Sequence, residues 1–194
     1  MGDFWPSTPF SAHAPLRRPA FVLAFALALP VAAQGYVPAY ERAPNFNNGP
    51  GTEVVLTYFG STTCTACQDP AFKAALGRAN TLLAERAASE GKTFVAIGVA
   101  LDPSVEDGLA FLSTSGRFDE VAVGRNWFDS AALAHIWRSE GRSGRTVALP
   151  GVMVFEREMT IGEAGVVPGA SRYLVERVGG ADIPAWVAAG APPD

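Results

Sequence analysis

The sequence has few of the residues that build metal centres, haem sites or disulfide frameworks. Its 194 residues include only two cysteines, Cys64 and Cys67, and two histidines, His13 and His135. A zinc site usually needs about four ligands, and covalent haem attachment needs a histidine directly after the second cysteine, where Gln68 stands. We therefore expect no metal, no haem and no other cofactor.

Strongly basic tracts are also absent. The chain has 15 Lys and Arg against 19 Asp and Glu, a formal net charge of −4, and no run of five like charges. Phosphate groups select for clustered Lys and Arg, so nothing in the composition favours a nucleic-acid partner. With 48% hydrophobic residues, the chain has the composition of one globular domain with additional segments.

Residues 1–33 have the pattern of an export signal. Arg17 and Arg18 precede an apolar run that ends in small residues at Ala33, as in the three regions of a secretory signal. We expect cleavage after Ala33, because an apolar run of about 15 residues is shorter than the ~20 that a membrane-spanning helix prefers. An uncleaved anchor within residues 17–33 is the alternative. Either form places the domain outside the cytoplasm, in the periplasm or an equivalent compartment.

The rest of the chain divides into a linker, a domain and a tail. Residues 34–52 are rich in proline, glycine and asparagine and lack an apolar period, which indicates a linker or a loosely docked arm. Residues 53–179 contain alternating strand and helix patterns. Residues 180–194 form a tail, with a short turn of helix near Pro184 and a frayed end.

Strand and helix patterns alternate in the first half of the domain. Residues 53–59 and 93–101 are nearly continuous apolar runs, as buried strands require. Between them, apolar residues recur at steps of four, three and four along one stripe of a long helix: Phe72, Leu76, Ala79 and Leu83. A strand, a helix and a second strand in this order favour a parallel pair with a crossover connection. The fold class is α/β.

An additional helix and strand follow the second buried strand. Ser104 is placed to cap a helix that carries three apolar residues on one side: Val105, Leu109 and Leu112. Residues 118–123 indicate a short third strand. Asp129 can cap a further helix, in which we expect His135 to pack as a structural residue beside Leu133 and Trp137 rather than to act as a general base.

The last part of the domain reads as a hairpin and a helix. A strand over residues 146–155 is interrupted near its start by a proline, which cannot donate a ladder hydrogen bond. A tight turn at residues 156–158 leads into an antiparallel partner strand over residues 159–167. Ser171 then caps a final helix that ends at Val178.

Cys64 and Cys67 are the strongest candidate site. They follow the first buried strand and stand at the start of a helix, where unpaired amides stabilise a thiolate. We therefore expect the first thiol to ionise more readily than a free cysteine, whose pKa is ~8.5. Residues three apart close too small a ring to stabilise a fold through loop entropy, which favours a chemical role. We predict that Cys64 attacks a disulfide and that Cys67, one turn further on, resolves the mixed disulfide.

From Val54 through Val178 the chain resembles the thioredoxin superfamily. The resemblance rests on the buried strand, the C-x-x-C pair at a helix start, the later strand-opening proline, and the closing hairpin and helix. It implies a thioredoxin-like fold, a central mixed sheet flanked by helices, with an extra strand–helix insertion before the cis-proline strand. It also implies that Leu149–Pro150 is the cis peptide beside the cysteines, and that Leu149, Pro150 and Thr63 contact the substrate.

Two positions differ from the pattern of that family. Thr63 stands where a tryptophan often precedes the first cysteine, and Tyr58 replaces the buried acid that many thioredoxins carry six residues before it. The change at Tyr58 removes the usual proton acceptor for the resolving thiol. We expect an extracytoplasmic thiol-disulfide oxidoreductase that acts on protein thiols and disulfides. The alternative is a non-catalytic interaction module of the same fold, an accessory subunit of a membrane-associated complex.

Overall fold

The computed structural model describes residues 50–137, 148–163 and 165–194. The predicted export signal, most of the predicted linker and the expected start of a strand at residue 146 lie outside the described residues. Among the helices in the described part of the chain, none combines the length and apolar character needed to cross a membrane.

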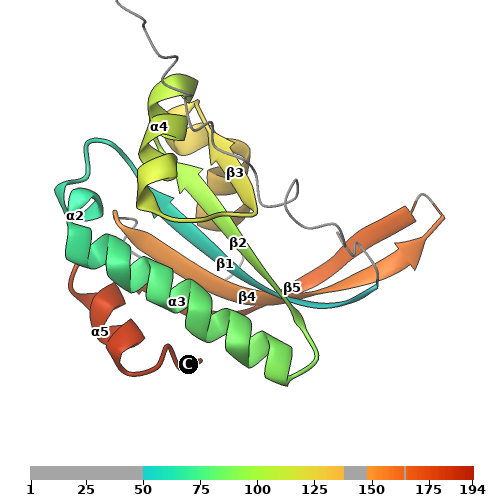
Figure 1. Cartoon of the computed structure of the whole chain (residues 1–194). Helices are drawn as coiled ribbons and strands as arrows, with labels where there is room; N and C mark the ends of the chain where they lie inside the picture. Colours follow the sequence, from blue (N-terminus) through green and yellow to red (C-terminus); the bar gives the residue numbers. More distant parts are fainter. Residues whose placement is uncertain (1–49, 138–147, 164) are drawn as a thin grey trace, which may run out of the picture. The chain divides into compact units, whose positions relative to one another are not determined.

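The described residues form a five-stranded mixed sheet in the order β3-β2-β1-β4-β5 (Figure 1). The central strand β1 (Gly51–Gly60) pairs in parallel with β2 (Thr93–Ala100) and antiparallel with β4 (Gly151–Gly162). Beyond β2 lies the short parallel strand β3 (Glu120–Val123), and beyond β4 lies the antiparallel strand β5 (Gly165–Val178). The predicted α/β class, the parallel pair, the short third strand and the antiparallel hairpin are confirmed.

Strand β1 is buried on both faces of the sheet. Leu56 and Tyr58 enter one apolar cluster, and Val55 and Phe59 enter a second cluster on the other side. All four side chains are at most 1% exposed. Since successive side chains of a strand point to opposite faces, a strand covered on both sides needs apolar residues at nearly every position. This explains the continuous apolar run in the sequence.

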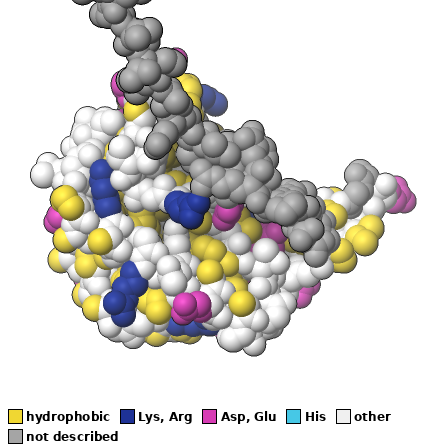
Figure 2. Space-filling model, in the orientation of Figure 1, with side chains coloured by type: hydrophobic (Ala, Val, Ile, Leu, Met, Phe, Trp, Pro, Cys, Tyr) yellow, Lys and Arg dark blue, Asp and Glu magenta, His cyan; other side chains and the backbone are white. Residues whose placement is uncertain are grey.

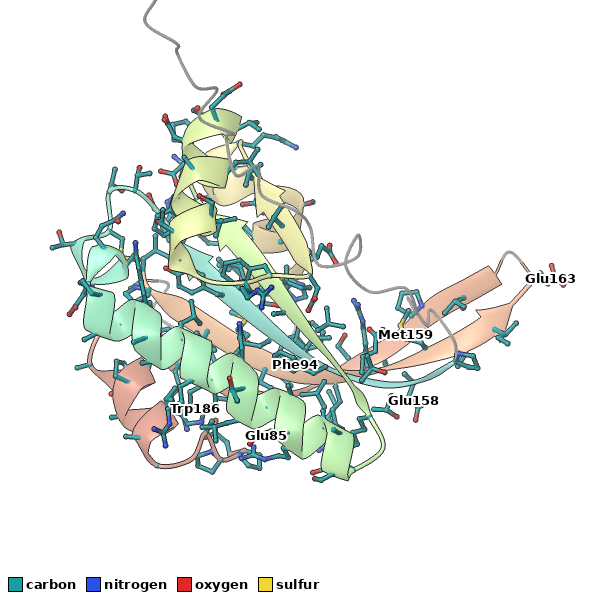
Figure 3. The ribbon with its side chains drawn as sticks, in the orientation of Figure 1. Glu85, Phe94, Glu158, Met159, Glu163 and Trp186 are labelled. Atoms are coloured by element: carbon teal, nitrogen blue, oxygen red, sulfur yellow. A yellow bond between two sulfur atoms is a disulfide. The ribbon has the colours of Figure 1, made fainter. Side chains whose placement is uncertain are left out.

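Helix α3 (Pro70–Ser89) covers the first face of the sheet, together with α4 (Val105–Ser115) and α5 (Asp182–Ala188). The buried side chains of α3 include all four that the sequence predicted: Phe72, Leu76, Ala79 and Leu83. Trp186 of α5 lies beside α3 (Figure 3) and is 5% exposed. The predicted apolar stripe therefore faces the sheet as expected.

The helix after the cysteines is divided, although a single long helix was predicted. Helix α2 (Thr65–Gln68) is one turn long, and α3 begins separately at Pro70. Asp69 lies between them in an extended conformation, because a residue that precedes proline avoids helical backbone angles. Its carboxylate accepts the Ala71 N–H at 2.8 Å and so caps α3. Cys67 therefore belongs to a single turn and not to the first turn of a long helix.

Helix α4 has the predicted cap but a different buried face. The Ser104 hydroxyl accepts an N–H of the first turn, as expected. Burial falls on Phe111 and Leu112, whereas Val105 and Leu109 are 46% and 42% exposed. Of the three apolar residues predicted to share one side of this helix, only Leu112 is buried, because the position of the sheet, not the apolar pattern alone, decides which side of a helix is covered.

The predictions for the hairpin were partly wrong. Strand β4 continues through the expected turn at residues 156–158, and the expected helix from Ser171 to Val178 is part of β5. Pairing with β4 provides the hydrogen bonds that this segment would otherwise make within a helix. A local capping signal cannot reveal such a long-range partner.

Strands β4 and β5 extend beyond the sheet as a two-stranded ribbon (Figure 1). The pairing of β1 with β4 ends where Gly51 lies opposite Met159, so the two strands pair only with each other farther along. Figure 3 shows Met159 and Glu163 along this ribbon, where Ile161 is 72% exposed. The ribbon projects away from the end of the sheet that carries the cysteines.

The C-terminal residues are bound to the domain, whereas a frayed end was predicted. Ala191 is fully buried, and its carbonyl oxygen accepts a hydrogen bond from Arg86 of α3 at 2.7 Å. The Trp186 indole N–H donates to the carbonyl oxygen of Pro192 at 2.8 Å. The Asp194 N–H donates to β5 at 3.0 Å. The tail therefore closes the apolar cluster beneath α3.

Charged side chains of both signs are mixed on the surface. Lys92 contacts Glu90 and Glu156, and Arg172 also contacts Glu156. On the face shown in Figure 2, positive and negative side chains are scattered among polar and apolar ones. The charged groups of this face are thus mixed in sign and do not gather into a patch of one sign.

The contrast between α3 and α4 gives a stability prediction. Leu76→Ala should lower the free energy of unfolding by about 3 kcal/mol, because it leaves a cavity in a fully buried site. Leu109→Ala makes the same chemical change at a half-exposed site and should cost less than about 1 kcal/mol. Urea unfolding measures both values. Equal losses would contradict the assignment of the buried faces.

Candidate functional site

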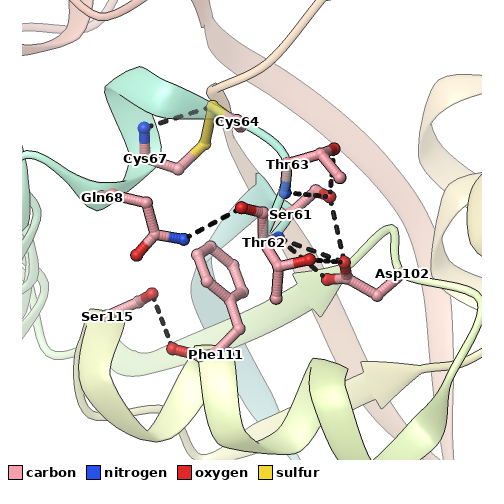
Figure 4. The surroundings of a disulfide bond; sticks show 9 residues. All are labelled: Ser61, Thr62, Thr63, Cys64, Cys67, Gln68, Asp102, Phe111 and Ser115. Atoms are coloured by element: carbon pink, nitrogen blue, oxygen red, sulfur yellow. Dashed lines mark hydrogen bonds between the residues drawn. A yellow bond between two sulfur atoms is a disulfide. The ribbon is translucent and has the colours of Figure 1, made fainter.

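The two cysteines lie at the carboxyl end of β1 (Figure 4). After Gly60 the chain turns through residues 61–63, and the Cys64 N–H donates to the carbonyl oxygen of Ser61 at 3.1 Å. Cys64 is extended and occupies the N-cap position of α2. The strand therefore leads directly into the cysteine pair, as the sequence predicted.

Cys64 and Cys67 form a disulfide, with their Cα atoms 5.2 Å apart. Cys64 is half-buried, whereas Cys67 is fully buried. The Cys67 backbone N–H donates to the Cys64 sulfur at 3.2 Å. A donor in this position favours a thiolate on Cys64 in the reduced protein. Attack by Cys64 and resolution by Cys67 stay a prediction, which the difference in exposure favours.

The length of α2 changes the expected source of thiolate stabilisation. The sequence pointed to the dipole of a long helix, but α2 ends after four residues. A single turn aligns few peptide dipoles. The individual Cys67 N–H, and not the dipole of α3, is therefore the feature that acts on Cys64.

A buried carboxylate supports the turn before Cys64. Asp102 follows β2 and is 1% exposed. Its carboxylate accepts hydrogen bonds from the Ser61 hydroxyl at 3.1 Å and from the Thr62 hydroxyl at 2.5 Å. The Thr62 N–H donates to both oxygens of the carboxylate, at 3.1 and 3.2 Å (Figure 4). Asp102 therefore binds two of the three residues between β1 and Cys64.

Sequence reasoning did not identify Asp102 as part of the site. The signal was nevertheless present, because the sequence predicted two parallel strands, and Asp102 and the cysteine turn each follow one of them. The carboxyl ends of adjacent parallel strands lie at the same edge of a sheet. A carboxylate directly after the second strand is therefore expected beside the turn that follows the first.

The Leu149–Pro150 peptide is cis, as the resemblance implied. Strand β4 begins at the next residue, Gly151, which pairs with Phe59 near the end of β1. The cis peptide therefore lies at the same edge of the sheet as the cysteines. Leu149 is half-buried and packs against the cluster that contains Cys67.

Thr63, the third residue predicted to contact substrate, is exposed. Its hydroxyl lies 3.0 Å from the Ser61 hydroxyl, which also bonds Asp102. The structure thus brings Thr63 into the hydrogen-bonded turn before Cys64. Contact of Thr63, Leu149 and Pro150 with a substrate stays a prediction.

Tyr58 is packed among aromatic rings beneath the site. Its ring lies 6.0 Å from the rings of Phe72 and Phe118 and 6.4 Å from that of Phe111. Within the described residues, its hydroxyl has no hydrogen-bond partner. The Ser115 hydroxyl donates instead to the Phe111 carbonyl oxygen at 2.9 Å.

This burial keeps the Tyr58 hydroxyl protonated. Desolvation raises the pKa of Tyr58 well above its ordinary value. A protonated phenol of such high pKa cannot accept a proton from a thiol near neutral pH. The tight packing around it is evident at Gly60, where an added Cβ would overlap the Tyr58 hydroxyl and approach Phe111 to 2.7 Å.

His135 packs on the other face of the sheet. It lies in the π-helical turn η2 (Ala132–Ile136), which Asp129 caps by accepting the Ala132 N–H at 2.8 Å. Its ring stacks on Phe155 at 5.0 Å, and its Nδ1 lies 3.1 Å from the Tyr173 hydroxyl. Its neighbours therefore differ from the predicted pair, Leu133 and Trp137, which are exposed.

No metal centre is visible in the part of the chain that the structure describes. In these ranges, no three His, Cys, Asp or Glu side chains lie together in a way that could hold a metal ion.

Tyr58→Phe tests whether the buried hydroxyl takes part in chemistry. We expect the variant to keep the stability of the wild type at pH 7 to within about 1 kcal/mol, because the lost hydroxyl makes no hydrogen bond. We also expect the same rate of thiol-disulfide exchange. A slower exchange in a folded variant would show that the phenol transfers a proton.

The same variant gives a pH dependence. The pKa of Tyr58 is higher in the folded than in the unfolded chain, so its contribution to stability is complete below the unfolded pKa of ~10. It is lost as the pH rises above that value, because the unfolded chain then binds fewer protons. Urea unfolding between pH 9 and 11 should show a steeper loss for the wild type than for Tyr58→Phe.

Two solved structures resemble this chain. One is a thiol:disulfide interchange protein of the thioredoxin family from Chlorobium tepidum TLS, with 18% sequence identity and a TM-score of 0.32 over 71% of this chain and 79% of that chain. The other is BsSco, a member of the Sco family of cytochrome c oxidase assembly proteins in which a disulfide switch was identified. It has 16% identity and a TM-score of 0.33 over 74% of this chain and 92% of that chain.

No protein-family model matches the sequence, and no curated protein matches it significantly. At the identities and TM-scores of the two structures, the likeness assigns no activity to this chain. The fold follows from the chain's own topology: a mixed sheet with β1 at its centre, a C-x-x-C pair after β1, and a cis-proline directly before β4. The described domain therefore has a thioredoxin-like fold with its cysteine pair and its cis-proline at one edge of the sheet.

Proposed function

We propose that this protein is a thiol-disulfide oxidoreductase that exchanges the Cys64–Cys67 pair with protein thiols and disulfides. The observation that carries the proposal is the unequal exposure of two bonded cysteines within one turn. The partly exposed Cys64 can meet the sulfur of another protein, while the buried Cys67 can reach only Cys64. This arrangement separates the attacking thiol from the resolving thiol.

The proposed reduction of a substrate disulfide has two steps. The Cys64 thiolate attacks one sulfur of the substrate disulfide, whose S–S bond breaks and releases the first substrate thiolate. Cys67 then loses its proton and attacks the Cys64 sulfur, which releases the second substrate thiolate and closes the Cys64–Cys67 disulfide. Two electrons pass to the substrate, and its two thiolates take up protons. A dithiol reductant restores the pair for the next cycle.

Serine variants of the two cysteines test this function. Cys64→Ser should abolish the reduction of insulin disulfides by dithiothreitol, because it removes the attacking thiol. Cys67→Ser should accumulate a mixed disulfide that mass spectrometry assigns to Cys64, since the chain contains no third cysteine. The double variant provides the background rate.

The opposite result would favour the second candidate function. If both single variants reduce insulin as fast as the wild type, the cysteine pair is not catalytic. The exchange of the usual acid and tryptophan for Tyr58 and Thr63 would then point to an interaction module, an accessory subunit of a membrane-associated complex.

We further propose that the protein works outside the cytoplasm. The support comes from the sequence of residues 1–33, with its arginine pair, apolar run and small residues. N-terminal sequencing and intact mass of the native protein should give a chain that begins after Ala33. A full-length chain in the membrane fraction would support the anchored form, and a full-length soluble chain would contradict export.

A further inference from the structure

The carboxylate of Asp102 is buried, and it has no cationic partner among the residues that the structure describes. Its residue is 1% exposed, and none of the ion pairs formed there includes it. Carboxylates are rarely buried unless their oxygens are paired or hydrogen-bonded. Here the partners are the Ser61 hydroxyl, the Thr62 hydroxyl and the Thr62 N–H. All three donors belong to the turn before Cys64.

The backbone around Asp102 is held in place from two sides. The N–H of Leu101 donates to the Gly60 carbonyl oxygen at 2.8 Å, and the Asp102 carbonyl oxygen accepts the Asn126 N–H at 3.2 Å. Asp102 is therefore a fixed point at the end of β2. The turn that carries Ser61 and Thr62 is the part that it positions.

Two further hydrogen bonds connect this fixed point to the reactive cysteine. The Thr63 N–H donates to the Ser61 hydroxyl oxygen at 3.2 Å, and the Cys64 N–H donates to the Ser61 carbonyl oxygen at 3.1 Å. Ser61 thus contacts Asp102 through its side chain and Cys64 through its backbone. Figure 4 shows the hydrogen bonds from Asp102 to Ser61 and Thr62 and those between Ser61 and Thr63, next to the disulfide.

We propose that Asp102 is a positioning residue that shifts the Cys64–Cys67 equilibrium toward the disulfide and so makes the reduced pair a donor of electrons. This role of Asp102 rests on the proposed exchange function and adds the direction in which electrons flow. In the reaction concerned, the dithiol reduces oxidised glutathione, which yields the Cys64–Cys67 disulfide and two glutathione thiols.

Two effects of Asp102 act in the same direction. Its hydrogen bonds to the turn keep Cys64 beside Cys67, which raises the effective concentration of the two thiols for each other. Its negative charge, bonded two residues before Cys64, opposes a second negative charge on the Cys64 thiolate. The first effect favours the oxidised pair, and the second disfavours the reduced one.

Asp102→Asn is the main test, in the purified full chain. Asparagine has nearly the same shape and keeps one oxygen acceptor, but it removes the charge and one acceptor of the Thr62 N–H. The pair is equilibrated with reduced and oxidised glutathione, and the dithiol fraction is measured by alkylation and intact mass. We expect the equilibrium constant for oxidation of the pair to fall about tenfold, which corresponds to a rise of about 30 mV in its reduction potential.

Asp119→Asn is the matched control. Like Asp102, Asp119 accepts a backbone N–H through its carboxylate, but its donor is Ala96 of β2 at 2.8 Å and not a residue of the cysteine turn. Its variant removes the same charge and should leave the equilibrium within about twofold of the wild type. An equal shift in both variants would assign the effect to net charge and would overturn the proposal.

Thr62→Val tests the same contact from the side of the turn. Thr62 is exposed, so the variant should fold even if Asp102→Asn does not. It removes one hydroxyl donor to Asp102 and should lower the equilibrium constant about threefold. The proposal would be overturned if the equilibrium constant of folded Asp102→Asn equalled that of the wild type, or if either variant shifted toward the disulfide. If Asp102→Asn does not fold, an unchanged equilibrium constant in Thr62→Val would overturn it.

This readout is separate from the test of the proposed function. The glutathione equilibrium needs only the two cysteines, whereas insulin reduction also needs access to a protein substrate. A wild-type chain that equilibrates with glutathione but does not reduce insulin would contradict the proposed function alone. An unchanged equilibrium in the variants, with active wild type, would contradict the role of Asp102 alone.

Discussion

The burial of β1 on both faces is the constraint on which the rest of the structure depends. Leu56 and Tyr58 require the cover of α3, α4 and α5, and Val55 and Phe59 require a second apolar layer on the other side. A one-residue shift in its register would move every side chain of this strand to the opposite face, where it would not fit the apolar cluster already packed there. Its carboxyl end is therefore held firmly, and the cysteine turn begins at that end.

The site contains two buried polar groups, the Tyr58 hydroxyl and the Asp102 carboxylate, and only the carboxylate is hydrogen-bonded within the described residues. Desolvation raises the pKa of Tyr58, whose hydroxyl has no hydrogen-bond partner within the described residues. Asp102 enters from the neighbouring strand, and its carboxylate is satisfied by the turn itself. Asp102 thus brings a carboxylate to the turn before Cys64, while the Tyr58 ring packs among other aromatic rings. This arrangement would link the redox balance of the cysteines to the conformation of their turn.

The accuracy of the sequence predictions depended on how local their physical cause was. The stripe of α3, the Ser104 cap and the two parallel strands were predicted well, because side-chain period and capping chemistry act over a few residues. The predicted helix at Ser171 was wrong, because that segment is held by hydrogen bonds to β4. The break before Pro70 also has a local cause, the proline itself, but the apolar stripe carries no sign of it.

The sequence by itself determined the α/β class, the pair Cys64 and Cys67, and the cis-proline candidate, because apolar period, motif spacing and family resemblance are properties of the linear chain. Only the tertiary structure decided that Cys67 is buried, that the C-terminal residues close the core, and that Asp102 binds the cysteine turn. Asp102 and Thr62 are 40 residues apart in sequence. They meet because β1 and β2 are parallel neighbours, and hydrogen bonding between strands brings their carboxyl ends together.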